Sequence, residues 1–306
     1  MTPSAKTALL ITNPASRRGL ALYEQTRQAM REAGIFCDAV LTEHPGHAAT
    51  LARTLAPQYD LVFTLGGDGT AMEVIGALAP NGPPVGILPG GTGNLLARAL
   101  GIPLAIRRAI PVLLAGDVTR IDLGRLEEGK GEHDRRFAIG VGVGIDAAMI
   151  AETSPQWKRR IGISAYVVVA ARAILRQDRF TVRVTAGDQV IERSASAVLI
   201  ANFGSLLNNL ITLGENIRYD DGLLNACVFD PQTFRDAVRI MWKLILRDFR
   251  PDPAMSYLAG SRITVETDPT RIAQADGDII GTSPFSVVTE PLAGCIIIPH
   301  RQITRQ

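Results

Sequence analysis

Strand-like runs alternate with helical patterns in the first third of the chain, and this alternation limits the folds that are available to it. The strand-like runs cover residues 7–12, 36–42, 60–65 and 84–89. Helical patterns follow them at about 20–33, 48–55, 71–78 and 95–100. Strands that are joined by helices pair in parallel, and their ligand sites lie in the loops after the strand carboxyl ends. We therefore expect an α/β domain that is built on a parallel sheet.

From about residue 122 the pattern changes to consecutive strand-like runs. They cover residues 136–144, 179–185, 189–203, 223–229, 262–268, 285–290 and 294–299. Helical patterns interrupt them only near 159–176 and 232–249. Successive strands without crossover helices are typical of an antiparallel sandwich or barrel. The sequence therefore predicts an α/β domain over residues 1–124, to which a C-terminal segment at about 291–306 can return, and a β-sandwich domain over 125–290.

Composition and charge exclude several classes of protein. The chain has 306 residues, and its 32 Lys and Arg against 30 Asp and Glu give a formal net charge of +2, so no overall field favours nucleic acid. Cys37, Cys227 and Cys295 lie far apart, which argues against a disulfide framework or a zinc knuckle and fits a reducing cytoplasm. The N-terminus does not read as a signal peptide, and no segment is apolar and long enough to span a membrane.

A glycine-rich loop follows the third strand-like run. Gly66, Gly67 and Gly69 surround Asp68 in the sequence GGDGT, which ends at Thr70. Glycines allow backbone N–H groups to approach phosphate oxygens at a helix N-terminus. Because a carboxylate repels phosphate, Asp68 is expected to bind the magnesium ion that accompanies a nucleotide. An ordinary Gly/Asp turn explains the loop equally well.

Two more polar loops follow other strands of the same predicted sheet. The sequence PGGTGN carries Gly91, Thr92 and Asn94, and the sequence TNPASRR carries Asn13 and Arg17. Loops that follow parallel strands meet at one edge of the sheet. Three such loops therefore favour an anion-binding site over a set of unrelated turns.

The ordered set of motifs resembles the diacylglycerol kinase catalytic-domain family, which includes bacterial diacylglycerol kinases, sphingosine kinases and related soluble lipid kinases. The resemblance extends over nearly the whole chain through TNPAS, TEHPGHAATLA, GGDGTAMEV, PGGTGNLLAR, IDLGRL, FAIGVGVGIDA, KRRIGISAY, DDGLLNACVF and ADGDIIGTSP. GGDGT alone is shared with NAD kinases and phosphofructokinases, so the ordered set is more specific than this one motif. The resemblance implies a nucleotide-binding α/β domain, a β-sandwich lipid domain, and phosphoryl transfer from ATP with magnesium to a lipid hydroxyl.

The resemblance also implies roles for particular residues. The nucleotide, its phosphates or the metal would contact Asn13, Thr42, Gly66, Gly67, Asp68, Gly69, Thr70, Glu73, Gly91, Thr92, Asn94, Arg159 and Gly277. Asp122 resembles an acidic position of the magnesium and water network. A solvated helix start is the alternative for Arg160, which follows Arg159.

The motif near the C-terminus departs from the family pattern. The family usually has Asp-Gly-Glu, whereas this chain has Asp276, Gly277 and Asp278. The resemblance implies catalytic roles for Asp276 and Asp278 together with Asp68, with Asp278 as the general base. The reach of Asp278 is shorter than that of a glutamate by about 1.5 Å, one carbon–carbon bond. The same motif predicts a hairpin turn, and Leu95 stands where the family often has another Asp.

A second metal site is implied near residue 220. The sequence NIRYDDGLL resembles a structural magnesium site of the bacterial branch, in which Asp220 and Asp221 would supply side-chain oxygens and Leu223 its carbonyl. Asn216 stands where an acidic ligand is common. A plain Asp-Asp-Gly turn is the alternative.

A basic stripe is predicted on the helix near residues 232–249. Its members recur every four residues and are Arg235, Arg239, Lys243 and Arg247. With Trp242 and other bulky apolar residues beside it, the stripe suits the headgroup boundary of an anionic membrane. A helix that packs on a sheet with its basic side in water explains the pattern equally well.

The sequence as a whole favours a cytoplasmic lipid kinase of two domains that makes transient, peripheral contact with an anionic membrane. Nucleic acid is not an expected partner, and the family resemblance allows a homodimer. One alternative is a kinase of a soluble acceptor, similar to NAD kinase. Another is a non-catalytic nucleotide-binding or lipid-binding protein that has lost its chemistry through Asp278 and Leu95.

Overall fold

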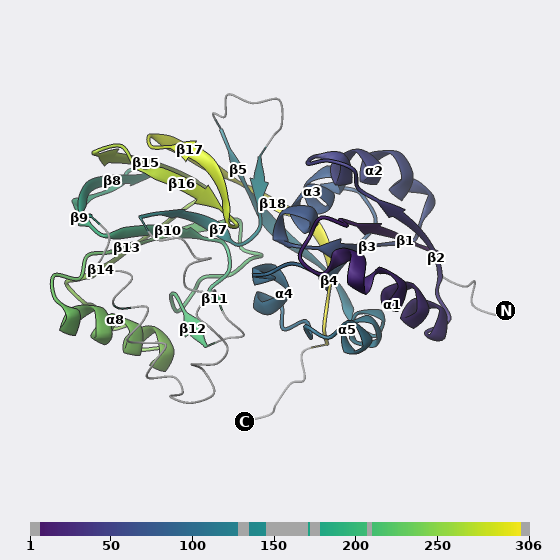
Figure 1. The fold of residues 1–306 in the computed structure, drawn as a ribbon. Helices are drawn as coiled ribbons and strands as arrows, with labels where there is room; N and C mark the ends of the chain where they lie inside the picture. Colours follow the sequence, from purple (N-terminus) through teal and green to yellow (C-terminus); the bar gives the residue numbers. More distant parts are fainter. Residues whose placement is uncertain (1–6, 128–134, 145–170, 172–177, 207–209, 301–306) are drawn as a thin grey trace. The chain divides into compact units, whose positions relative to one another are not determined.

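The computed structural model describes residues 7–127, 135–144, 171, 178–206 and 210–300. The chain divides into two compact units, Met1–Ile121 with Leu292–Gln306, and Asp122–Pro291. Two long strands, β5 (Asp117–Leu126) and β18 (Phe285–Ile298), contribute residues to both units (Figure 1).

The first unit is built on a parallel sheet, as predicted. Its strands follow the order β2 (Phe36–Leu41), β1 (Thr7–Thr12), β3 (Leu61–Gly66), β4 (Val85–Pro89) and the C-terminal part of β18. Every neighbouring pair is parallel. Strand β3 is buried along its whole length, whereas β2 lies at the edge. The chain order reverses between β1 and β3, and α/β sheets bind ligands at such a switch point.

Helices cover both faces of this sheet (Figure 1). They are α1 (Gly19–Glu32), α2 (His47–Leu55), α3 (Asp68–Leu78), α4 (Leu95–Ala99) and α5 (Ile106–Leu114), with a short 3-10 helix at Ala56–Gln58. Helix α2 packs beside α3 on one face, and α1 packs beside α5 on the other. Helix α5 was not predicted from the sequence, because Pro111 in its interior lacks an N–H group. Burial of one apolar face stabilises α5 nevertheless, through Ile106, Ala109, Ile110 and Leu113.

The second unit is an antiparallel β-sandwich, again as predicted. One sheet has the order β14 (Met255–Gly260), β13 (Leu224–Phe229), β10 (Ala197–Ala201), β7 (Gly140–Val143), β16 (Ile272–Ala275) and β17 (Asp278–Thr282). The N-terminal part of β18 forms the other sheet with β15 (Arg262–Asp268), β8 (Phe180–Ala186) and β9 (Gln189–Ala195). Buried side chains of both sheets form one core, among them Val143, Val182, Val198 and Ile263.

Smaller strands and shifted boundaries complete this unit. Strand β5 pairs with β6 (Arg136–Phe137), and β11 (Ser205–Leu206) pairs with β12 (Ile211–Thr212). The run that was predicted as one strand over 189–203 is two strands, β9 and β10, which are separated at Ser196. Conversely, the runs at 285–290 and 294–299 belong to the single strand β18.

Helix α8 (Phe234–Leu246) packs on the face of β10 and β13 that points away from the sandwich core. Its residues Ile240, Met241 and Leu244 are buried against Cys227 and Phe229. This second core exists because successive residues of a strand point to opposite faces. Among the helices within the described part of the chain, none is long and apolar enough to cross a bilayer.

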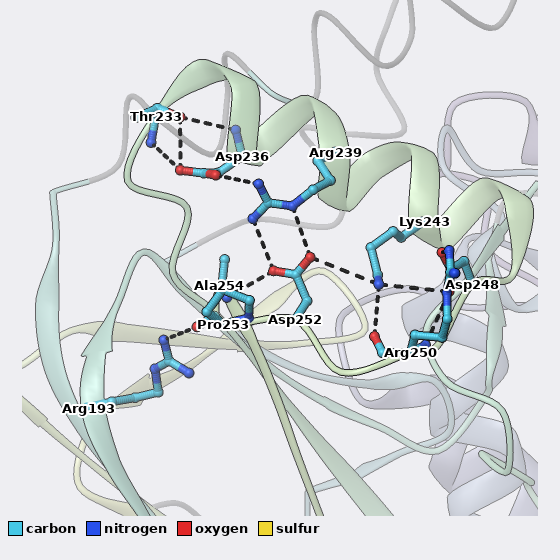
Figure 2. Close-up of polar contacts among 10 residues, drawn as sticks. All are labelled: Arg193, Thr233, Asp236, Arg239, Lys243, Asp248, Arg250, Asp252, Pro253 and Ala254. Carbon is cyan, nitrogen blue, oxygen red and sulfur yellow. Dashed lines mark hydrogen bonds and ion pairs between the residues drawn. The ribbon is translucent and has the colours of Figure 1, made fainter.

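A network of ion pairs holds the loop after α8 against the helix (Figure 2). Arg239 donates from Nε to Oδ2 of Asp252 at 2.9 Å, from Nη2 to Oδ1 at 3.1 Å, and also to Asp236. Lys243 donates from Nζ to the Arg250 carbonyl at 2.8 Å. The Asp252 side chain is only 6% exposed. The hydrogen-bonded guanidinium of Arg239 lowers the pKa of the Asp252 carboxyl below its usual value.

Asp252→Asn is expected to lower the free energy of unfolding by about 1–2 kcal/mol near neutral pH, because the partly exposed Arg239 loses its ionic partner. Since the folded-state pKa of Asp252 is depressed, this contribution is present above the unfolded-state pKa of about 4 and is lost as the pH falls through the folded-state pKa. Urea unfolding of both proteins should therefore show a difference that narrows in acid.

The exposed turn residue Asp188 supplies a matched control, Asp188→Asn, for which no loss of stability is expected. A difference between wild type and Asp252→Asn that stays constant as the pH falls would contradict an ionic origin for this contribution.

Candidate functional site

Four loops meet at the carboxyl ends of the parallel strands in the first unit. The loop after β1 is tied to the loop after β4 by a hydrogen bond from Arg18 N to Gly90 O at 2.9 Å. The loop after β4 is tied to the end of β3 by a bond from Gly90 N to Gly66 O at 2.8 Å. Thr42, at the end of β2, donates from its N to Thr12 O at 2.9 Å. The parallel pairing of the four strands therefore brings the loops after β1, β2, β3 and β4 together at one edge of the sheet.

A pocket of about 450 Å³ lies among these loops. It is lined by Asn13, Pro14, Ala15, Ser16, Arg17, Thr42, Glu43, His44, Pro45, Ala48, Gly67, Gly69, Thr70, Glu73, Gly91 and Thr92. Of the predicted nucleotide residues, Gly66, Asp68 and Asn94 support this lining from the loops behind it. Arg159 lies outside the described residues, and Gly277 belongs to the second unit.

The pocket floor requires glycine where two loops touch. A Cβ atom on Gly91 would lie 2.5 Å from Gly67 Cα, a distance that side chains essentially never adopt. Gly67 immediately precedes α3, whose first N–H groups have no partner within the helix. An anion at such a helix N-terminus is favoured by these N–H groups and by the helix dipole. The floor therefore fits a phosphate group.

Asp68 holds the start of another helix. Its Oδ2 accepts a hydrogen bond from Leu95 N at 3.0 Å, and its Oδ1 accepts one from Leu96 N at 2.9 Å. These are the first two residues of α4. Asn94, which precedes α4 in a left-handed conformation with φ 48°, bonds through its side chain to both N and O of Gly91. The predicted metal ligand is therefore also the cap of α4.

Glu73 caps the start of helix α2, as Asp68 caps α4. Its Oε1 accepts a hydrogen bond from Gly46 N at 3.0 Å, and its Oε2 accepts one from Ala48 N at 3.1 Å. Asn13 donates from Nδ2 to Thr70 Oγ1 at 3.1 Å, which joins the loop after β1 to α3. The polar side chains predicted to contact the nucleotide thus fix the loops to one another as well as lining the pocket.

The loop after β2 contributes pocket residues that sequence analysis did not assign to the site, namely Glu43, His44 and Pro45. The His44 ring stacks on His47, with the ring centroids 4.8 Å apart. His47 is the first residue of α2, as the predicted helix start required. The position of the TEHPGH sequence directly after a parallel strand was the signal that could have identified these residues.

Asp276 anchors the hairpin between β16 and β17 in the second unit. The hairpin pairs Ala275 with Asp278, and Asp276 has φ 47° and Gly277 φ 99°, as an Asp-Gly turn requires. The Asp276 carboxylate accepts hydrogen bonds from three consecutive backbone N–H groups at 2.8, 3.0 and 2.9 Å, those of residues 138, 139 and 140. Asp278 is exposed at the start of β17, and its carboxylate has no hydrogen-bond or ion-pair partner among the described residues.

The predicted structural metal loop is a network of local contacts. Asp122 is fully buried, and its Oδ2 accepts a hydrogen bond from Gly222 N at 2.6 Å. Asp220 pairs with Arg218 at 2.9 Å, and Asp221 accepts a bond from the N of Leu223 at 3.0 Å. Asn216 is exposed. Within the described part of the chain, no three acidic, His or Cys side chains gather as a metal site. These contacts fit the Asp-Asp-Gly turn, and metal binding here stays a prediction.

The fold and the pocket define a class: proteins that join a parallel α/β unit with glycine-rich loops at its strand ends to an antiparallel β-sandwich. Comparison with known proteins refines it. The model of the Diacylglycerol kinase catalytic domain matches residues 7–126, and that of the YegS C-terminal NAD kinase beta sandwich-like domain matches residues 139–298. The chain therefore belongs to the diacylglycerol kinase catalytic-domain family, a family of lipid kinases, and the predicted resemblance is confirmed.

Relatives of this family align over most of the chain. A diacylglycerol kinase of Staphylococcus saprophyticus is 29% identical over 287 residues, which is 91% of each protein. A diacylglycerol kinase of Staphylococcus epidermidis is 27% identical over 285 residues, 91% of this chain and 88% of the relative. The crystal structure of a diacylglycerol kinase of Bacillus anthracis has a TM-score of 0.71 and 20% identity, with 98% of this chain and 99% of the other covered. The last likeness shows the fold alone.

Asp276→Asn is expected to lower the free energy of unfolding of the second unit by about 1–3 kcal/mol, because the neutral amide offers one oxygen to the three N–H groups that the carboxylate now satisfies. Asparagine tolerates the left-handed backbone, so the change isolates the anchor from backbone strain. Urea unfolding measures the loss. Asp278→Asn is the matched control two residues away, and an equal loss in both variants would contradict the anchoring role.

Proposed function

We propose that this protein is an ATP- and magnesium-dependent kinase that phosphorylates the hydroxyl group of diacylglycerol or a related lipid. The observation that carries the proposal is the glycine-floored pocket at the switch point of the parallel sheet, which fits phosphate groups. Membership of a lipid kinase family supports the acceptor class. Phospholipid biosynthesis is the setting that such a reaction would serve.

In this proposal the phosphates of ATP bind over the loops 66–70 and 90–94. Backbone N–H groups of the glycine loops would hold the phosphate oxygens, and Asn13, Thr42 and Thr92 would orient the nucleotide. Arg159 is proposed to contact the phosphates. When bound, a magnesium ion would neutralise charge on the phosphates. Asp68 is the carboxylate proposed to reach that ion.

The acceptor side of the reaction is assigned to the second unit. Asp278 would accept the proton of the lipid hydroxyl while the hydroxyl oxygen forms a bond to the γ-phosphorus and the bond to the ADP oxygen breaks. Asp276 would act as a positioning residue, since its carboxylate holds the hairpin that presents Asp278. Asp122 is proposed to belong to the magnesium and water network; it is buried, and its Oδ2 accepts a hydrogen bond from Gly222 N.

Asp278→Asn is expected to lower kcat by at least about 100-fold with the free energy of unfolding unchanged, because the amide cannot take up a proton. The measurement of kcat follows the transfer of labelled phosphate from ATP to diacylglycerol in mixed micelles. The product is identified by its mass. Asp188→Asn serves as the activity control. Full retained turnover in Asp278→Asn would refute the assignment of the base.

Asp68→Asn is expected to lower turnover by a similar factor, because the charge that favours the metal is lost while one oxygen remains to cap α4. Raising the magnesium concentration should restore part of the activity of this variant and leave that of Asp278→Asn unchanged. Activity of Asp68→Asn that equals wild type at limiting magnesium would contradict the metal role.

A catalytically inactive binding protein is the second candidate, and the shorter side chain at Asp278 together with Leu95 is the observation that favours it. A panel of acceptors separates the possibilities: diacylglycerol, sphingoid bases and NAD, each with ATP and magnesium. Phosphorylation of NAD alone would support a kinase of a soluble acceptor. If the wild type phosphorylates none of these acceptors and the Asp278→Glu variant phosphorylates a lipid, the result would support the catalytically inactive binding protein.

The proposed lipid acceptor also bears on where the protein acts in the cell. We propose a cytoplasmic protein with peripheral membrane contact, because a kinase of a membrane lipid has to reach its acceptor at the bilayer surface. A homodimer is compatible with this proposal, and sedimentation of the purified chain would determine the oligomeric state.

A further inference from the structure

Helix α8 presents three different faces. One face is buried against the sandwich through Ala237, Ile240, Met241 and Leu244. A second face carries the charged residues Asp236, Arg239 and Lys243, which hold the loop that follows the helix (Figure 2). The third face carries side chains that recur every four residues, Phe234, Val238, Trp242 and Leu246. Val238 also packs against the second core, whereas the other three are exposed.

The third face is an exposed apolar stripe. Phe234 is 44% exposed, Trp242 38% and Leu246 70%, while Val238 between them is half-buried. Residues four apart lie above one another on a helix, so these side chains form one continuous ridge along about 20 Å of the 13-residue helix. A row of exposed apolar side chains that is rimmed by polar residues is typical of an interaction site.

Among the described residues, the unpaired charges that flank the apolar stripe are both positive. Arg235 and Arg247 are exposed near its two ends, and neither has an ion-pair partner among the described residues. The acidic groups nearby are engaged on the charged face instead, where Asp236 and Asp252 bind Arg239. The basic stripe expected from the sequence is therefore divided: Arg239 and Lys243 belong to the loop network, and only the outer two arginines accompany the apolar ridge.

We propose that the ridge Phe234–Val238–Trp242–Leu246 is the surface by which this protein docks on an anionic bilayer, with the apolar side chains inserted at the headgroup boundary and Arg235 and Arg247 bound to lipid phosphates. The proposal rests on the proposed function, because a lipid acceptor requires access to a bilayer. Indole and aliphatic side chains flanked by arginines match the interfacial region, where apolar burial and attraction to anionic lipid act together. The docking is driven mainly by apolar insertion, since only two cations flank the ridge.

Binding of the full chain to vesicles of phosphatidylglycerol and phosphatidylcholine tests the ridge without any assay of activity. Trp242→Ala with Leu246→Ala should weaken the vesicle partition coefficient by at least tenfold. The control removes two other exposed apolar side chains, Val118→Ala (60% exposed) with Val190→Ala (56% exposed), and should bind as wild type does. Equal binding of the ridge variant and the control would overturn the proposal.

Fluorescence locates the inserted residue. The chain has two tryptophans, so Trp157→Phe leaves Trp242 as the reporter, and Trp242→Phe leaves Trp157. Addition of anionic vesicles should shift the emission of Trp242 to shorter wavelength. An unshifted Trp242 spectrum under conditions in which the protein sediments with the vesicles would show that another surface docks, and would overturn the proposal.

The two arginines are tested separately from the apolar ridge. Arg235→Gln with Arg247→Gln should lower partition onto phosphatidylglycerol vesicles to the level seen with phosphatidylcholine, and should leave partition onto phosphatidylcholine unchanged. A variant that keeps the full preference for anionic vesicles would refute the phosphate contacts. A loss of self-association in the Trp242→Ala, Leu246→Ala variant, with vesicle binding intact, would assign the ridge to an interface between copies and overturn the proposal.

Turnover on two forms of the acceptor distinguishes failure of docking from failure of the proposed function. A short-chain diacylglycerol that is dispersed as monomers should be phosphorylated equally by wild type and by the Trp242→Ala, Leu246→Ala variant. A long-chain diacylglycerol embedded in anionic vesicles should be phosphorylated at least tenfold more slowly by the variant. Equal loss on both acceptors would overturn the docking role, whereas a wild type that phosphorylates neither acceptor refutes the proposed function and leaves the vesicle experiments as the decisive test of the ridge.

Discussion

Two carboxylates on helix α3 hold the starts of two other helices, and the whole pocket depends on this arrangement. Asp68 accepts hydrogen bonds from the first residues of α4, and Glu73 accepts them from the start of α2. The first N–H groups of a helix have no partner within it, and a negative charge there also favours the helix dipole. Neither helix has a side-chain cap of its own. Because α3 supplies both caps, the loops that precede α2 and α4 are fixed against the loop that precedes α3.

The second unit repeats this device on a hairpin. Asp276 satisfies three consecutive N–H groups and so fixes a turn whose next strand begins with Asp278. In each unit an aspartate beside a glycine, Asp68 or Asp276, holds backbone N–H groups in place. This structural role does not depend on whether the residue also contacts a ligand. A sequence motif cannot separate these roles, because an Asp that caps a helix and an Asp that binds a metal both occur next to glycine at the end of a strand. Only the partners of each oxygen distinguish them.

The parts of the fold that depend on local pattern were predictable from the sequence. Strand β1 was predicted with its observed bounds and β3 to within one residue at each end, because buried parallel strands are short, continuous apolar runs. Helix α5 was missed because Pro111 obscures an amphipathic pattern, and β18 was predicted as two strands because Pro291 interrupts its apolar residues. The basic stripe of α8 was predicted without its partner Asp252, since a loop that folds back on a helix leaves no periodic signal. Glu43 and His44 are a different case, because their position directly after a parallel strand was a signal for the pocket that was not used.

The anchored hairpin also bears on the departure at Asp278. A carboxylate that lacks one methylene loses about 1.5 Å of reach, and a flexible loop could recover this distance by moving its backbone. The hairpin cannot move in this way without breaking the three hydrogen bonds of Asp276 and the pairing of β16 with β7. If Asp278 is the general base, as proposed, the shorter side chain is compensated on the acceptor side by a hydroxyl group that lies closer to the turn. In the proposed reaction, the residue at position 278 then selects among lipids by how deeply their hydroxyl enters, so the departure from glutamate is a determinant of specificity for an active enzyme.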